Sequence, residues 1–146
     1  MCLITDSNIP LVAEEDIEVY KVMEVMTDKK GSPFGVPPYR PLYRYHPGKN
    51  QSSEYDITMY GNKPVKTSPS GLYYMVEAGY LHAYVDWHAA THLYTHTLLN
   101  SGGTLYSACK IVKMTVPKGT KYFLGNDNDI AAETLVWNPE EQTVKN

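Results

Sequence analysis

The sequence predicts an α+β fold in which a mainly antiparallel sheet is accompanied by one principal helix. Several short runs alternate apolar and polar residues with a period of two, which is typical of half-buried strands. One run, 86–100, instead repeats apolar residues at helical spacing. The segments between the runs are rich in Pro and Gly, which interrupt regular hydrogen bonding. Because strand-like runs outnumber the helical run and the helix lies among them, we expect an α+β arrangement.

The predicted strands are defined by this alternation and by the turn residues that bound them. The clearest example is 54–60, where Tyr55, Ile57 and Met59 are separated by polar residues. In the aromatic run 72–85, Gly79 is expected to separate two strands or to mark a bulge. The predicted strands are 16–26, 42–46, 54–60, 72–85, 104–116, 121–124 and 130–137. We expect loops over 27–41 and 61–71, and turns over 47–53 and 125–129.

The helix is predicted over 86–100. Asp86 is a suitable N-cap, because its carboxylate can accept a hydrogen bond from a backbone N–H of the first turn. One face of the helix would carry the apolar side chains of Trp87, Ala90, Tyr94 and Leu98. We expect a single domain over 1–146, with an N-terminal tail over 1–13 and a C-terminal tail over 138–146.

The composition excludes several classes of protein. The 42% of hydrophobic residues argues against wholesale disorder, and the net charge of −3 argues against a protein that coats nucleic acid or anionic lipid. The two cysteines, Cys2 and Cys109, form no disulfide framework, so reduced thiols are the simpler expectation. No secretory signal is recognisable, and the apolar runs are shorter than the roughly 18 residues of a membrane span. We therefore expect a cytoplasmic protein.

Tyrosine is unusually frequent, with 13 residues against two Phe and two Trp. Its ring is apolar and its hydroxyl is polar, which suits clefts and interfaces as well as half-buried strands. The segment 39–46 interleaves such rings with cations, and we expect the Tyr-rich loops around 34–46 to form a contact surface together with the strand at 72–84. The candidate binding residues in this segment are Tyr39, Arg40, Tyr43, Arg44 and Tyr45. The alternative is that the rings are buried and only the arginines meet water.

Three histidines, His88, His92 and His96, follow one another at intervals of four in the predicted helix. Neighbouring histidines at this spacing can share a zinc ion if other segments supply further ligands, so His88 and His92 are candidate metal ligands. The alternative is that the histidines form a solvated or interface surface, because they lie roughly opposite the apolar side of the helix.

The last third of the chain contains two recognisable motifs, VPKGTKYFLG at 116–125 and IAAETLV at 130–136. With these motifs, 78–137 resembles a family of small uncharacterised proteins from phages and gut Bacteroidetes. More distantly, the order of elements resembles that of ADP-ribosyltransferases. This second resemblance implies NAD as a cofactor and Glu133 as a catalytic carboxylate, with His82 and Tyr20 near it.

Three functions follow from these observations. The first is a non-enzymatic binding or accessory protein of the phage or Bacteroidetes type, with a Tyr-rich surface and no cofactor. Its partner would be a protein or a small molecule rather than nucleic acid or a membrane, and its oligomeric state is left open. The second is an ADP-ribosyltransferase-like or other nucleotide-binding enzyme. The third is a protein that binds metal through its histidine-bearing helix.

Overall fold

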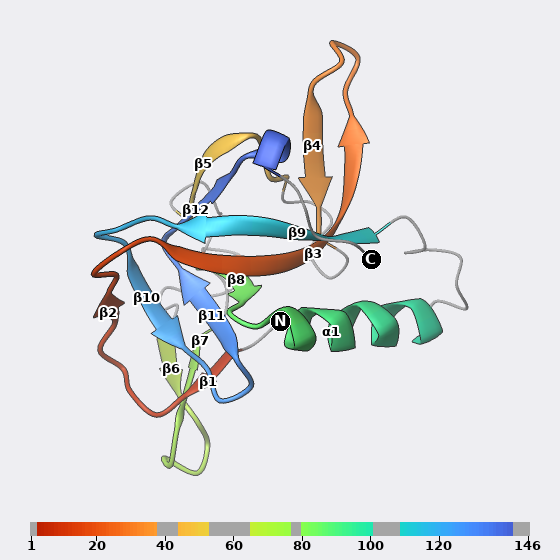
Figure 1. Cartoon of the computed structure of the whole chain (residues 1–146). Helices are drawn as coiled ribbons and strands as arrows, with labels where there is room; N and C mark the ends of the chain where they lie inside the picture. The colour runs from red at the N-terminus through yellow and green to blue at the C-terminus, as the bar shows by residue number, and fades with distance from the viewer. Residues whose placement is uncertain (1–2, 38–43, 53–64, 77–79, 101–108, 142–146) are drawn as a thin grey trace.

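A computed structural model describes residues 3–37, 44–52, 65–76, 80–100 and 109–141 (Figure 1). These residues form twelve strands, one α-helix and one short 3-10 helix. The elements are β1 (Leu3–Thr5), β2 (Leu11–Val12), β3 (Ile17–Thr27), β4 (Pro33–Val36), β5 (Gly48–Gln51), β6 (Val65–Thr67), β7 (Tyr74–Val76), β8 (Leu81–Tyr84), α1 (Trp87–Asn100), β9 (Cys109–Val116), β10 (Lys121–Leu124), β11 (Asp129–Ala132), β12 (Thr134–Trp137) and η3 (Pro139–Glu141).

The expected α+β class is wrong, because the described residues are mostly antiparallel β-structure with a single α-helix. The helix lies where it was predicted, but segments expected to be irregular form strands. The N-terminal segment 1–13 contributes β1 and β2, and the Pro-rich loop contributes β4. Segments expected to form a turn and a flexible connection contribute β5 and β6. These strands are two to four residues long, too short for a pattern of alternation to identify them.

Nine strands form one sheet and three form another. The long path through the larger sheet is β2-β10-β11-β8-β3-β9-β12-β5, and β4 pairs with β3 beside this path. The smaller sheet has the order β1-β7-β6. Strand β3 pairs antiparallel with both β8 and β9, so these two strands run parallel to each other. The chain between β8 and β9 contains α1, which lies against β3 (Figure 1).

The larger sheet is apolar on both faces, as the sequence of β3 shows. Val19 and Met23 belong to the main core cluster, which β8, β9, β11 and β12 complete. Val22 points to the other face, where it packs with Ala90 of α1. That second face is also covered by the smaller sheet through a separate cluster that contains Leu3, Val76, Phe123 and Ala131. The helix and the smaller sheet therefore cover different parts of the larger sheet.

The predicted cap of α1 is confirmed. An oxygen of the Asp86 carboxylate accepts the backbone N–H of His88 over 3.0 Å. Ala90 is fully buried, so the helix approaches the sheet closely at this turn. Trp87 and Tyr94 pack on the sheet from the same side, whereas His88 is exposed. The helix therefore turns its ring-bearing face inward, as its sequence predicts.

Candidate functional site

A row of four polar side chains crosses the middle of the larger sheet. Tyr20 of β3 lies directly opposite Lys113 of β9 on one side and Tyr84 of β8 on the other. Tyr84 in turn lies opposite Asp129, the first residue of β11. Residues that are directly opposite in a sheet share a face, so this row lies on the face that α1 covers. Two phenols thus stand side by side, with an ammonium group at one end and a carboxyl group at the other.

The turn between β10 and β11 is held against the beginning of α1. The backbone N–H of Val85 donates to the carbonyl oxygen of Asn128 over 2.9 Å. Asn128 has a φ of 60°, a left-handed conformation that Asn tolerates. Gly125 is needed for a different reason, because a Cβ there would lie 2.0 Å from Oδ1 of Asp129. This geometry places Asp127, at the tip of the turn, next to the helix.

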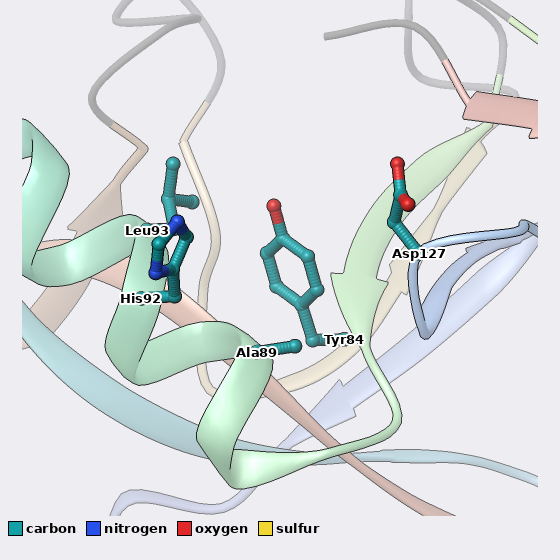
Figure 2. A pocket seen from close by; sticks show the side chains of 5 residues that line it. All are labelled: Tyr84, Ala89, His92, Leu93 and Asp127. Carbon is teal, nitrogen blue, oxygen red and sulfur yellow. The ribbon is translucent and has the colours of Figure 1, made fainter.

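A pocket of about 470 Å³ lies between the helix and this turn (Figure 2). Its lining combines an apolar part with three polar groups, and consists of Tyr84, Ala89, His92, Leu93 and Asp127. In Figure 2 the Tyr84 ring stands between the helical side chains and Asp127. A volume of several hundred Å³ and a mainly apolar lining with a few polar groups are typical of small-molecule sites.

Carboxylates affect the Tyr20 phenol of this row. The Tyr20 hydroxyl donates to Oε1 of Glu18 over 2.6 Å. This hydrogen bond, followed by burial and by the charges of Glu18 and Asp86, raises the pKa of Tyr20 to about 12. Burial raises the pKa of the Asp129 carboxyl, although the backbone N–H groups of Asp129 and Asp127 act in the opposite direction. Asp129 therefore has a stronger preference for its neutral form than an exposed carboxyl has.

None of the three residues of the enzyme hypothesis is among the described residues that line the pocket beside α1. Tyr20 lies beside Tyr84, and His82 is two residues away on the same face of β8, where it is buried. Glu133 lies at the bend between β11 and β12, and its charge, after burial, raises the pKa of Tyr80. Neither Glu133 nor His82 lines the pocket beside α1.

The Tyr-Arg segment is only partly described. Tyr39, Arg40 and Tyr43 lie outside the described residues. Arg44 is exposed, and its guanidinium carbon lies 4.7 Å from the centroid of the Phe34 ring. Tyr45 is fully buried in the main core cluster, so it is a core residue and contributes nothing to an exposed contact surface.

The two candidate metal ligands are both exposed. The His88 ring meets the Trp87 ring edge-on, with centroids 5.6 Å apart. His92 lies one turn further along the helix and lines the pocket. Within the described ranges, no group of three or more His, Cys, Asp or Glu side chains is placed to hold a metal ion.

A second pocket of about 480 Å³ lies where β5 begins and β12 ends. Its lining is rich in proline and consists of Pro33, Pro47, Gly48, Val136, Trp137, Asn138, Pro139 and Glu140. Trp137 is almost fully buried, and in the described part of the chain its Nε1 has no hydrogen-bond partner. The described lining of this pocket contains one charged group, Glu140, and one aromatic ring, that of Trp137.

The fold and the first pocket define a small β-rich protein with a ligand-sized pocket beside its α-helix. Comparisons of the chain with protein-family models, with curated proteins and with solved structures find no match. Among the described residues, no helix is long and apolar enough to cross a membrane.

Sequence reasoning missed Tyr84, Ala89, Leu93 and Asp127 as members of one site. Two signals were present: Tyr84 ends an aromatic strand just before the N-cap Asp86, and Asp127 lies in a clear turn motif. What joins them is the pairing of β8 with β11, which brings together residues more than 40 positions apart.

Proposed function

We propose that this chain is a non-enzymatic binding protein whose contact surface is the aromatic face around α1, centred on the pocket at Tyr84. The observation that carries the proposal is the lining of that pocket, in which Ala89 and Leu93 supply apolar surface and a phenol, an imidazole and a carboxylate supply polar contacts. Tyr20 and Trp87 extend the aromatic surface under and beside the helix. Tyrosine-rich surfaces of this kind are enriched where proteins bind ligands and partners.

This proposal relocates the Tyr-rich surface that the sequence predicts. The predicted strand 72–84 contributes to it through Tyr84, whereas Tyr45 is part of the core. The nucleotide-binding alternative receives less support from the geometry, because Glu133 and His82 lie away from the pocket. That alternative stays a prediction, and calorimetry with NAD tests it directly. We also propose a cytoplasmic location, supported by the free, buried thiol of Cys109.

The proposed function is tested by filling the pocket from within. Ala89 is half-buried and lines the pocket, so Ala89→Leu adds three carbon atoms there while keeping a good helix former. The protein is titrated with a library of small aromatic and charged fragments and followed by NMR. We expect some of these fragments to shift the amide signals of Leu93 and Asp127. In the Ala89→Leu variant the affinity of those fragments should fall by about tenfold or more, equivalent to about 1.4 kcal/mol.

The matched control is Thr95→Leu, which introduces the same leucine side chain at an exposed position of α1 that is not among the described residues lining the pocket. It should bind the fragments like the original chain. A fragment library that leaves the pocket amides unshifted, or equal binding to the original chain and Ala89→Leu, would overturn the proposed function.

A further inference from the structure

We infer that the pocket beside α1 selects a primary amine on a short aliphatic chain, the chemistry of a lysine side chain. This inference rests on the proposed function and adds the class of ligand. Three features of the pocket support it: the charges around it, the order of its polar and apolar walls, and the N-terminus of α1, where Asp86 accepts a backbone N–H.

The charges around the pocket favour a cation. Asp127 contributes an exposed carboxylate to the lining itself. Asp86 begins the helix two residues after Tyr84, and Glu18 accepts the hydrogen bond of Tyr20. The nearest lysine in the cross-strand row is Lys113, and Tyr20 separates it from Tyr84. Among the described residues that line the pocket, one carries a carboxylate and none is Lys or Arg.

The walls of the pocket are ordered in the way that an alkylammonium group requires. Ala89 and Leu93 form the apolar wall on the helix, against which methylene groups can pack. The Tyr84 ring follows, and Asp127 stands beyond it on the turn (Figure 2). A cation placed at the far end of such a chain meets both an aromatic ring and a carboxylate.

An anion, the opposite choice, is disfavoured at this place. A helix N-terminus attracts anions through its unpaired N–H groups, but here Asp86 already accepts the N–H of His88. The Asp86 carboxylate thus occupies part of the anion-binding capacity of the helix N-terminus and repels a second negative group. Among the described residues of the lining, the basic side chain is the imidazole of His92.

The test compares two probes that differ in one group. Nα-acetyl-lysine methylamide carries the ammonium group, and Nα-acetyl-norleucine methylamide carries the same aliphatic chain without it. In NMR titrations we expect the lysine probe to shift the amides of Ala89, Leu93 and Asp127 and to bind more tightly than the norleucine probe. The difference should shrink as salt is raised, because it is electrostatic. Butylammonium, as a third probe, distinguishes a free amine from a lysine within a peptide.

The matched variants remove one negative charge each. Asp127→Asn should lower the affinity for the lysine probe about two- to fivefold, the range for a partly exposed ion pair, and leave the norleucine probe unchanged. Glu14→Gln is the control, because Glu14 is exposed and follows β2, at the far end of the sheet from α1 (Figure 1). It should bind both probes like the original chain.

The outcomes separate the two proposals. If the norleucine probe binds as tightly as the lysine probe, or Asp127→Asn has no effect, the preference for an amine is wrong and the binding pocket stands. If anionic fragments bind at these amides and the lysine probe does not, the ligand class is also wrong. If no probe or fragment shifts the pocket amides, the proposed function itself fails.

Discussion

Arg44 and Tyr45 are neighbours in the sequence but lie in opposite environments. Tyr45 is fully buried, its backbone pairs with Gly35, and the Lys21 ammonium lies 5.0 Å from its ring centroid. We expect Tyr45→Ala to lower the free energy of unfolding by about 3–5 kcal/mol, as for other buried aromatic residues. Arg44→Ala should cost no more than about 1 kcal/mol, because an exposed cation–π contact is weak. Urea denaturation of both variants measures the difference, and similar losses would contradict the core position of Tyr45.

Asp129 is a buried residue whose charge should affect stability. Burial raises its pKa in the folded chain above the unfolded value near 3.8. Its contribution to stability is therefore fully present below the unfolded pKa and is lost as the pH rises through the folded pKa. Asp129→Asn keeps the shape and removes the charge, so its stability relative to the original chain should increase over that window and level off above it. Urea denaturation at steps from pH 4 to pH 8 follows this difference, and a constant difference would refute the explanation.

At the scale of elements, the sequence predicts those strands and helices that a local pattern of apolar residues determines. The alternation in 16–26 predicts β3, and Asp86 followed by helical spacing predicts α1. The strands it misses are short and depend on distant partners. Strand β4 begins with Pro33 and pairs with β3, and its Gly35 also bridges Tyr45. A proline is tolerated at the first residue of a strand.

The hairpin that joins β3 to β4 is likewise not revealed by its local sequence alone. Oδ1 of Asp28 accepts the backbone N–H groups of Lys30 and Ser32, each over 2.9 Å, and Gly31 adopts a φ of 84°. These residues mark a turn in the sequence, and this turn was expected as part of a loop. Their sequence does not reveal that the chain beyond them returns along β3.

The site was less predictable than the fold for a related reason. Tyr84, Leu93 and Asp127 come from a strand, a helix and a turn, and each alone has an ordinary structural explanation. Only the pairing of β8 with β11 places Asp127 beside the helix, and pairing between distant strands is not encoded in local periodicity. The resemblance to ADP-ribosyltransferases selected Glu133 instead, whose charge, after burial, raises the pKa of Tyr80.

At the scale of the whole molecule, the first residues tie the two sheets together. Leu3 is fully buried between them, and the carbonyl oxygen of Ile4 accepts the N–H of Asn126 in the turn beside the pocket. We expect Leu3→Ala to cost about 2–5 kcal/mol in thermal or urea unfolding. Ile9→Ala is the matched control, because Ile9 is 72% exposed, and it should change stability by less than about 0.5 kcal/mol. A small effect of Leu3→Ala would show that this segment is a tail after all.

The position of β3 between β8 and β9 has a consequence during synthesis of the chain. Tyr20 emerges from the ribosome long before Tyr84 and Lys113, the residues that flank it in the finished sheet. At 5–20 residues per second, the wait for Lys113 is on the order of five to twenty seconds. During that interval Val19, Val22 and Met23 have neither neighbour to shield them, so the nascent chain exposes an apolar strand that can bind chaperones or self-associate until β9 has been synthesised.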